Sequence, residues 1–131
     1  MKKLLTLLFS ILISFNSYGE WIKVTKSISG SAKGDTYYVD IDTIKENDGY
    51  VYFWVLQDKL KPDKWGDMSV KALIQGDCRL NRDKTLSYIF YKQPMGEGEN
   101  ETSTPSNPEW GYSKPNSVGE TGLNYVCDYV K

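Results

Sequence analysis

The sequence predicts an α+β domain: a mostly antiparallel sheet of about five or six strands, with a C-terminal helix packed on one face and tied to it by one disulfide. Several segments alternate apolar and polar residues and are joined by short connections, which is typical of antiparallel strands. The last residues instead repeat apolar side chains at helical spacing. Only two cysteines occur, Cys78 at the end of the longest alternating segment and Cys127 in the helical pattern.

Residues 1–19 have the order of a secretory signal peptide: two lysines, an apolar run at residues 4–15, and small residues at the −3 and −1 positions before Glu20. The run is shorter than the roughly 20 residues that span a bilayer, so we expect cleavage rather than anchoring. No cysteine lies near the cleavage point, which argues against a lipid anchor. We therefore expect a single exported domain at residues 20–131, periplasmic, secreted or on the cell surface, without a transmembrane span.

An even number of cysteines in an exported chain predicts a bridge between Cys78 and Cys127, because the compartment is oxidising. Two unpaired buried thiols are the alternative. A closed loop of about fifty residues would stabilise the fold by roughly 4 kcal/mol. The bridge is expected to be structural, since a redox role would favour a Cys-x-x-Cys pair.

The strands follow one another with turn residues between them. In chain order they are expected at residues 20–25, 36–41, 50–58, 67–79 and 84–93. A short helical turn is expected at 42–46, and Asp48-Gly49 reverses the chain after it. The strand at 50–58 is apolar on both faces, which places it near the middle of the sheet.

Residues 94–116 are predicted to form a long loop, because they are rich in glycine, proline and glutamate. So long a loop in a small domain is either functional or mobile. Trp110 stands out within it. Its indole either pins the loop to the body of the domain or forms an exposed binding aromatic.

Ser117 and Glu120 match a capping box, in which both side chains bond to free backbone N–H groups at a helix start. One helical face follows it, made by Leu123, Val126, Cys127 and Val130. Gly119 and Gly122 weaken the helix by about 1 kcal/mol each relative to alanine. We therefore expect the sheet and the bridge to hold it.

The chain contains no histidine, which removes the usual general base and the commonest zinc ligand. We find no phosphate-binding glycine motif and no calcium-loop spacing, and we predict no cofactor, no metal and no catalytic residues. Its 16 basic and 17 acidic residues are interspersed, which argues against nucleic acid as a partner. A glycosidase that uses Asp40 and Asp42 as acid and base is the remaining enzymatic alternative.

A surface, rather than a pocket, is the stronger candidate for function, because the helix covers only one face of the sheet. The candidate binding residues are Tyr52, Trp54, Ser69, Lys71 and Tyr91, with Trp110 from the loop. A lysine among aromatic rings suits recognition of a protein or a glycan. Ordinary cross-strand packing is the alternative explanation.

Several short motifs, each found once, follow one another through nearly all of the chain after residue 19. They are Tyr37-Tyr38-Val39-Asp40, Gly49 with Trp54 and Asp58, Ser69-x-Lys71 before Cys78, Tyr91 with Met95-Gly96-x-Gly98, Trp110, and Pro115-x-Ser117-x-x-Glu120 before Cys127. In this order they resemble the bacterial surface-adhesin protein E family.

The resemblance implies an antiparallel sheet covered by a C-terminal helix with a disulfide between them, and an exported adhesin that binds host extracellular proteins. We accordingly expect a non-enzymatic binding module with a partner, protein or glycan, on the cell envelope or outside the cell. A periplasmic inhibitor or accessory protein and a structural envelope component remain as alternatives. The absent lipidation cysteine departs from the adhesin and leaves outer-membrane attachment as an open point.

Overall fold

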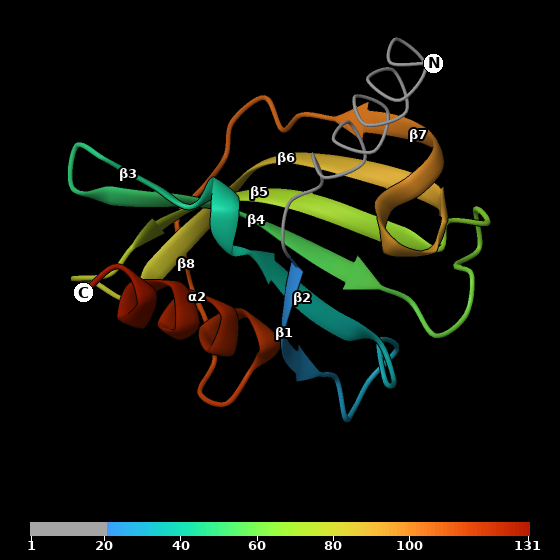
Figure 1. Ribbon diagram of the computed structural model, residues 1–131, viewed down its shortest axis with the longest axis horizontal. Coiled ribbons are helices and arrows are strands. Elements are labelled where there is room, and N and C mark those ends of the chain that lie inside the picture. The colour runs from blue at the N-terminus through green and yellow to red at the C-terminus, as the bar shows by residue number, and fades with distance from the viewer. Residues whose placement is uncertain (1–20) are drawn as a thin grey trace, which may run out of the picture.

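The computed structural model describes residues 21–131, which form one antiparallel eight-stranded sheet and one long helix (Figure 1). The predicted signal segment and Glu20 lie outside the described residues. The elements are β1 (Trp21–Lys26), β2 (Thr36–Asp40), the 3-10 turn η1 (Ile41–Thr43), β3 (Lys45–Asn47), β4 (Tyr50–Asp58), β5 (Ser69–Asp77), β6 (Arg82–Gln93), the 3-10 turn η2 (Pro94–Gly96), β7 (Glu97–Ser103), β8 (Gly111–Tyr112) and α2 (Val118–Tyr129).

The strand order is β1-β2-β4-β5-β6-β7, and β3 and β8 pair with parts of β4 and β6. Every pairing is antiparallel. The apolar strand β4 lies in the interior of the sheet between β2 and β5. The predicted fold class is therefore confirmed, with more strands than expected.

The extra strands are short or polar. The prediction of an uninterrupted loop at 94–116 is wrong, because it contains η2, β7 and β8. All residues of β7 are exposed, and its sequence EGENETS shows no apolar alternation. An edge strand of this kind is held by backbone pairing to β6 rather than by a buried face, so its composition resembled that of a loop.

The core lies between α2 and the facing side of the sheet, where the helix contacts β1, β2 and β4 (Figure 1). Its buried members are Val39, Val51, Phe53, Leu123 and Val126. Gly76 allows the close approach, since a Cβ there would lie 2.6 Å from Leu123 Cδ1 and 2.9 Å from Val51 Cγ2. The apolar face of the strand at 50–58 therefore meets the apolar face of the helix, as predicted.

Cys78 and Cys127 form the predicted disulfide, with their Cα atoms 5.8 Å apart. The alternative of two free thiols is wrong. Cys78 follows β5 at an exposed position rather than within the core. The bridge therefore fastens the C-terminal part of α2 at the rim of the sheet.

The helix start is also as predicted. Ser117 Oγ accepts a hydrogen bond from the N–H of Glu120 at 3.2 Å. The Glu120 carboxylate accepts from the N–H of Asn116 at 3.1 Å, one residue before the N-cap. Within residues 21–131, no helix has both the length and the apolar character needed to cross a bilayer.

Candidate functional site

The face of the sheet opposite α2, here called the outer face, carries most of the predicted binding residues. Val51 and Phe53 of β4 face the helix, so alternation turns Tyr52 and Trp54 to the outer face. Lys71 is paired with Leu56 of β4 and with Ile89 of β6. The register therefore brings side chains from three central strands onto one surface.

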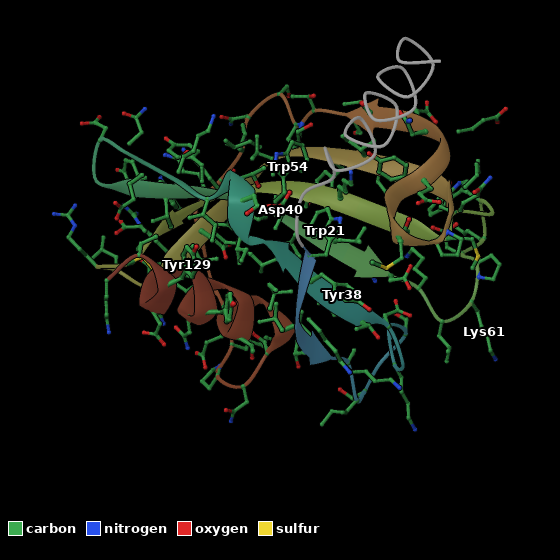
Figure 2. The ribbon with its side chains drawn as sticks, viewed as in Figure 1. Trp21, Tyr38, Asp40, Trp54, Lys61 and Tyr129 are labelled. Carbon is green, nitrogen blue, oxygen red and sulfur yellow. A yellow bond between two sulfur atoms is a disulfide. The ribbon has the colours of Figure 1, made fainter. Side chains whose placement is uncertain are left out.

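Two adjoining hollows occupy this surface. The first, of about 190 Å³, is lined by Trp21, Asp40, Thr43, Trp54, Lys71, Ile89 and Tyr91. The second, of about 520 Å³, is lined by Thr43, Lys45, Asn47, Tyr52, Trp54 and Leu73. Trp54 and Thr43 line both, so we treat the pair as one outer-face groove. Figure 2 shows Trp21, Asp40 and Trp54 gathered near the middle of the molecule.

Lys71 supplies the positive charge of the smaller hollow, and the exposed Lys45 lines the larger one. Lys71 Nζ lies 5.5 Å from the centre of the Trp21 ring and 5.2 Å from that of Tyr91. The stem packs on the turn after β6, because a Cβ at Gly96 would lie 2.6 Å from Lys71 Cε. The ammonium group is thus held in place between aromatic rings, where a cation–π attraction stabilises it.

Asp40 lies at the floor of the outer-face groove and is 6% exposed. Its carboxylate accepts a hydrogen bond from the N–H of Asp42 at 3.1 Å and caps η1. The hydroxyl of Thr43 donates to the Asp40 carbonyl at 3.2 Å. The helical turn predicted at 42–46 is therefore an earlier 3-10 turn, and Asp40 has a structural role in presenting Thr43 to the groove.

Ser69, one of the predicted binding residues, is completely buried. Its hydroxyl donates to the Gln93 carbonyl at 2.7 Å and accepts from the N–H of Gly96 at 2.8 Å. The Asp58 carboxylate likewise accepts from the N–H of Met95 at 2.8 Å. These bonds fold η2 over the end of the outer face, so the Ser69 hydroxyl is used within the fold and Ser69 is not part of the exposed surface.

Trp110 lies apart from the outer-face groove and lines neither hollow. Its ring centre is 5.4 Å from that of Tyr50. The charged groups of Arg82 and Lys84 lie 4.4 Å and 4.5 Å from the indole. Of the two roles considered for Trp110, these contacts favour pinning the segment before β8 to the sheet.

The structure thus brings Tyr52, Trp54, Lys71 and Tyr91 together and adds residues that the sequence did not assign to the site. Chief among these are Trp21, Thr43 and Ile89. Alternation in the first strand would have put Trp21 on the face opposite Ile22. Its approach to Lys71 of β5, however, depends on the order and register of the strands between them, which alternation alone does not set.

A larger hollow, of about 870 Å³, lies on the other side of the β3–β4 hairpin and shares Asn47 with the outer-face groove. Its wall is formed by the β3–β4 turn, both cysteines and the last residues of the chain. Tyr50 is the only aromatic residue in its lining. The charged residues of the lining are Glu46, Asp48, Asp128 and Lys131. Because several aromatic rings surround a lysine in the outer-face groove and not in this hollow, the outer-face groove is the better candidate site.

A comparison with protein families finds that the Surface-adhesin protein E family matches residues 21–128. A sequence search of curated proteins finds no match.

The fold is similar to solved structures of Haemophilus influenzae protein E. One, crystal form II, is 16% identical over 84% of this chain and 99% of that chain, with a TM-score of 0.61. A second has 14% identity over 83% and 94%, with a TM-score of 0.59. A third, from a non-typeable strain, has 15% identity over 85% and 86%, with a TM-score of 0.56. At such identity the likeness establishes the fold alone.

Proposed function

The chain belongs to the surface-adhesin protein E family, and on that premise we propose that it is an exported, non-enzymatic binding module whose outer-face groove recognises a protein or glycan on the cell envelope or outside the cell. The family relation supports a surface adhesin-like protein. Export, the class of partner and the site itself are our proposals.

The observation that carries the proposal is the convergence of Tyr52, Trp54 and Lys71 in the outer-face groove. Tyr91 is only 8% exposed and contributes by packing against the ammonium group of Lys71. Aromatic rings beside a fixed ammonium group offer apolar area, cation–π contacts and one charge-assisted hydrogen bond. The same groups suit a peptide segment with an acidic side chain or a sugar with a carboxylate. The helix leaves this face uncovered, so a partner can reach it.

The glycosidase alternative finds less support. Asp40 already accepts a backbone hydrogen bond as the cap of η1, so its carboxylate has a structural role. We expect Asp40→Asn to retain partner binding. Loss of a glycan-hydrolysing activity in that variant would favour the enzyme instead. A periplasmic inhibitor or accessory protein would use the outer-face groove in the same way, with a different partner.

Site-specific photo-crosslinking tests the outer-face groove directly. A photoreactive phenylalanine derivative replaces Tyr52 within the outer-face groove, and Tyr129 on α2 serves as the matched position away from it. We expect a covalent adduct with an envelope or host-surface component from position 52 and none from position 129. Equal adducts from both positions would place binding elsewhere.

Once a partner is captured, Lys71→Gln tests the charge. We expect its affinity to fall about tenfold, a loss of ~1.4 kcal/mol, while Lys114→Gln at an exposed site binds as the original chain does. Unchanged affinity in a folded Lys71→Gln variant would remove the lysine from the proposed site.

Export is tested separately. We expect N-terminal sequencing of protein from the cell envelope or medium to begin at or near Glu20, with no attached lipid. A chain that retains residues 1–19 in the membrane fraction would contradict both parts of this prediction.

A further inference from the structure

A second surface lies at one end of the sheet, away from the outer-face groove. Two connections form it, residues 27–35 between β1 and β2 and residues 59–68 between β4 and β5. They lie side by side, because the N–H of Leu60 donates to the Asp35 carboxylate at 2.9 Å. Figure 2 shows Lys61 of this surface far from Trp54 and from Tyr129 on the helix. We call the two connections together the basic tip.

In the basic tip the carboxylates bond to groups of the fold, whereas most of the lysines are exposed to solvent. Its sequence contains the four lysines Lys33, Lys59, Lys61 and Lys64 and the three aspartates Asp35, Asp63 and Asp67. Each aspartate accepts hydrogen bonds from, or pairs with, neighbouring groups of the fold.

Asp35 is 7% exposed and also accepts from Gln57 Nε2 at 2.8 Å. Asp63 accepts from the N–H groups of Trp65 and Asp67, both at 2.9 Å. Asp67 is 7% exposed and pairs with Lys92 at 2.9 Å. The carboxylates therefore shape the connections from within, whereas Lys33, Lys61 and Lys64 are exposed.

Large apolar side chains stand out among these lysines. Ile28 is 85% exposed, Leu60 62% and Trp65 68%. The hydrogen bonds to Asp63 fix the backbone beneath Trp65, so its indole is held outward by a well-bonded turn rather than by a loose loop. Exposed apolar groups gathered at one place on a surface mark an interaction site.

Between the two connections lies a hollow of about 400 Å³. Its charged lining is Lys33, Lys59 and Lys61 with Asp35 and Asp63, and Leu60 lines it too. Asp63 pairs with Lys59 at 3.7 Å, and Asp35 is held by backbone and Gln57 hydrogen bonds, so Lys33 and Lys61 are the lysines left for a phosphate. Lysines around a hollow, with apolar side chains beside it, suit a headgroup phosphate whose acyl chains begin next to the protein. Tryptophan is enriched at this depth of a bilayer, and lysines are attracted to anionic headgroups.

We propose that the basic tip docks on the surface of an anionic phospholipid membrane, with a headgroup phosphate between the lysines and with Ile28, Leu60 and Trp65 in the interfacial layer. The exposed glutamates of β7 start at the same end of the sheet as the basic tip, but at the edge beyond β6. The proposed contact therefore uses the β1–β2 side of the tip. The contact is peripheral and reversible, and it leaves the outer-face groove open to a partner.

Vesicle flotation tests the proposal with a chain that begins at Glu20, because this chain keeps every strand and the helix that the structure describes. This chain also lacks the apolar run at 4–15, which would itself enter lipid. We expect binding to vesicles of phosphatidylglycerol and phosphatidylcholine, little binding to phosphatidylcholine alone, and a decline as salt screens the lysines.

The variants separate charge from apolar insertion. Each neutralised lysine should lower the partition coefficient about fivefold, so Lys33→Gln with Lys61→Gln should lower it about 25-fold. Lys114→Gln with Lys131→Gln, at exposed positions outside the tip, is the matched control and should change it less than twofold. Leu60→Ser with Trp65→Ser should abolish flotation, while circular dichroism stays that of the folded chain.

Several results would overturn the proposal. These are no flotation of the original chain, equal binding to neutral vesicles, or equal losses in the two pairs of lysine variants. If the lysines matter but Leu60→Ser with Trp65→Ser floats normally, the contact is electrostatic alone and the proposed placement of Leu60 and Trp65 in the interfacial layer is wrong. None of these results bears on the outer-face groove, which is tested by crosslinking at position 52.

Discussion

The ammonium group of Lys71 lies 5.2 Å from the centre of the Tyr91 ring, so this charge in the outer-face groove rests on an aromatic face before any partner arrives. Trp21 approaches the same group from β1, at 5.5 Å. The lysine is therefore part of the packing of the outer face as well as a candidate contact.

Reversal of this charge should consequently affect stability. From the sequence we would expect Lys71→Glu to leave packing almost untouched. The two ring contacts instead predict a loss of about 1–2 kcal/mol in the free energy of unfolding. Urea denaturation measures it. Lys114→Glu, at an exposed position, should change the same quantity by less than about 0.5 kcal/mol, and equal effects of the two substitutions would argue against the cation–π contacts.

The disulfide should account for a large part of the stability. Cys78 and Cys127 are 49 residues apart in sequence, and opening a loop of that size costs about 4 kcal/mol in the chain-entropy account. We expect Cys78→Ala with Cys127→Ala to lower the free energy of unfolding by roughly that amount. The control is a reducing agent, which should lower the melting temperature of the original chain and leave that of the double variant unchanged.

The sheet and helix approach each other most closely at Gly76, where an added methyl group would collide with Leu123 and Val51. Gly76→Ala should therefore reduce the free energy of unfolding by about 1–3 kcal/mol. Gly122→Ala is the matched control, since a Cβ there meets nothing within 4 Å. Because alanine favours helix, Gly122→Ala should instead stabilise by about 1 kcal/mol. A stabilising Gly76→Ala would contradict the packing described.

Asp77 should make stability depend on acid pH. Burial acts to raise the pKa of this carboxyl, but the hydrogen bonds from Arg82, Leu80 and Arg79 outweigh it and hold the pKa below its ordinary value of 3.8. Such a group stabilises the fold above its ordinary pKa, and the contribution is lost as pH falls through the lower folded value. The difference in unfolding free energy between the original chain and Asp77→Asn should therefore be full at pH 7 and shrink below about pH 4.

Asp83 provides a control of opposite sign, because burial raises its pKa above the ordinary value. Its contribution is present in acid and is lost as pH rises through the folded pKa. Asp83→Asn should therefore gain stability relative to the original chain as pH rises above about 4. Parallel pH dependence in the Asp77 and Asp83 variants would show that these local environments do not control the titration.

The sequence alone determined the elements whose signal is local. Alternation in the strand at 50–58 placed Val51 and Phe53 on one face and Tyr52 and Trp54 on the other, since a pleated strand turns successive side chains to opposite sides. The spacing of Leu123, Val126 and Cys127, with the cap at Ser117, located the helix. The even number of cysteines and the predicted signal peptide together predicted the bridge, because an oxidising compartment favours disulfide formation.

The tertiary structure decided what depends on partners distant in sequence. Polar residues of β7 form a strand only because β6 offers a free edge, and Ser69 is lost from the surface only because η2 folds over it. Trp21 meets Lys71 through the pairing of β1 with β2 and the curvature of the sheet. Alternation states which face a side chain occupies. Register, which is fixed by cross-strand hydrogen bonds along the whole sheet, determines which side chains on that face are neighbours.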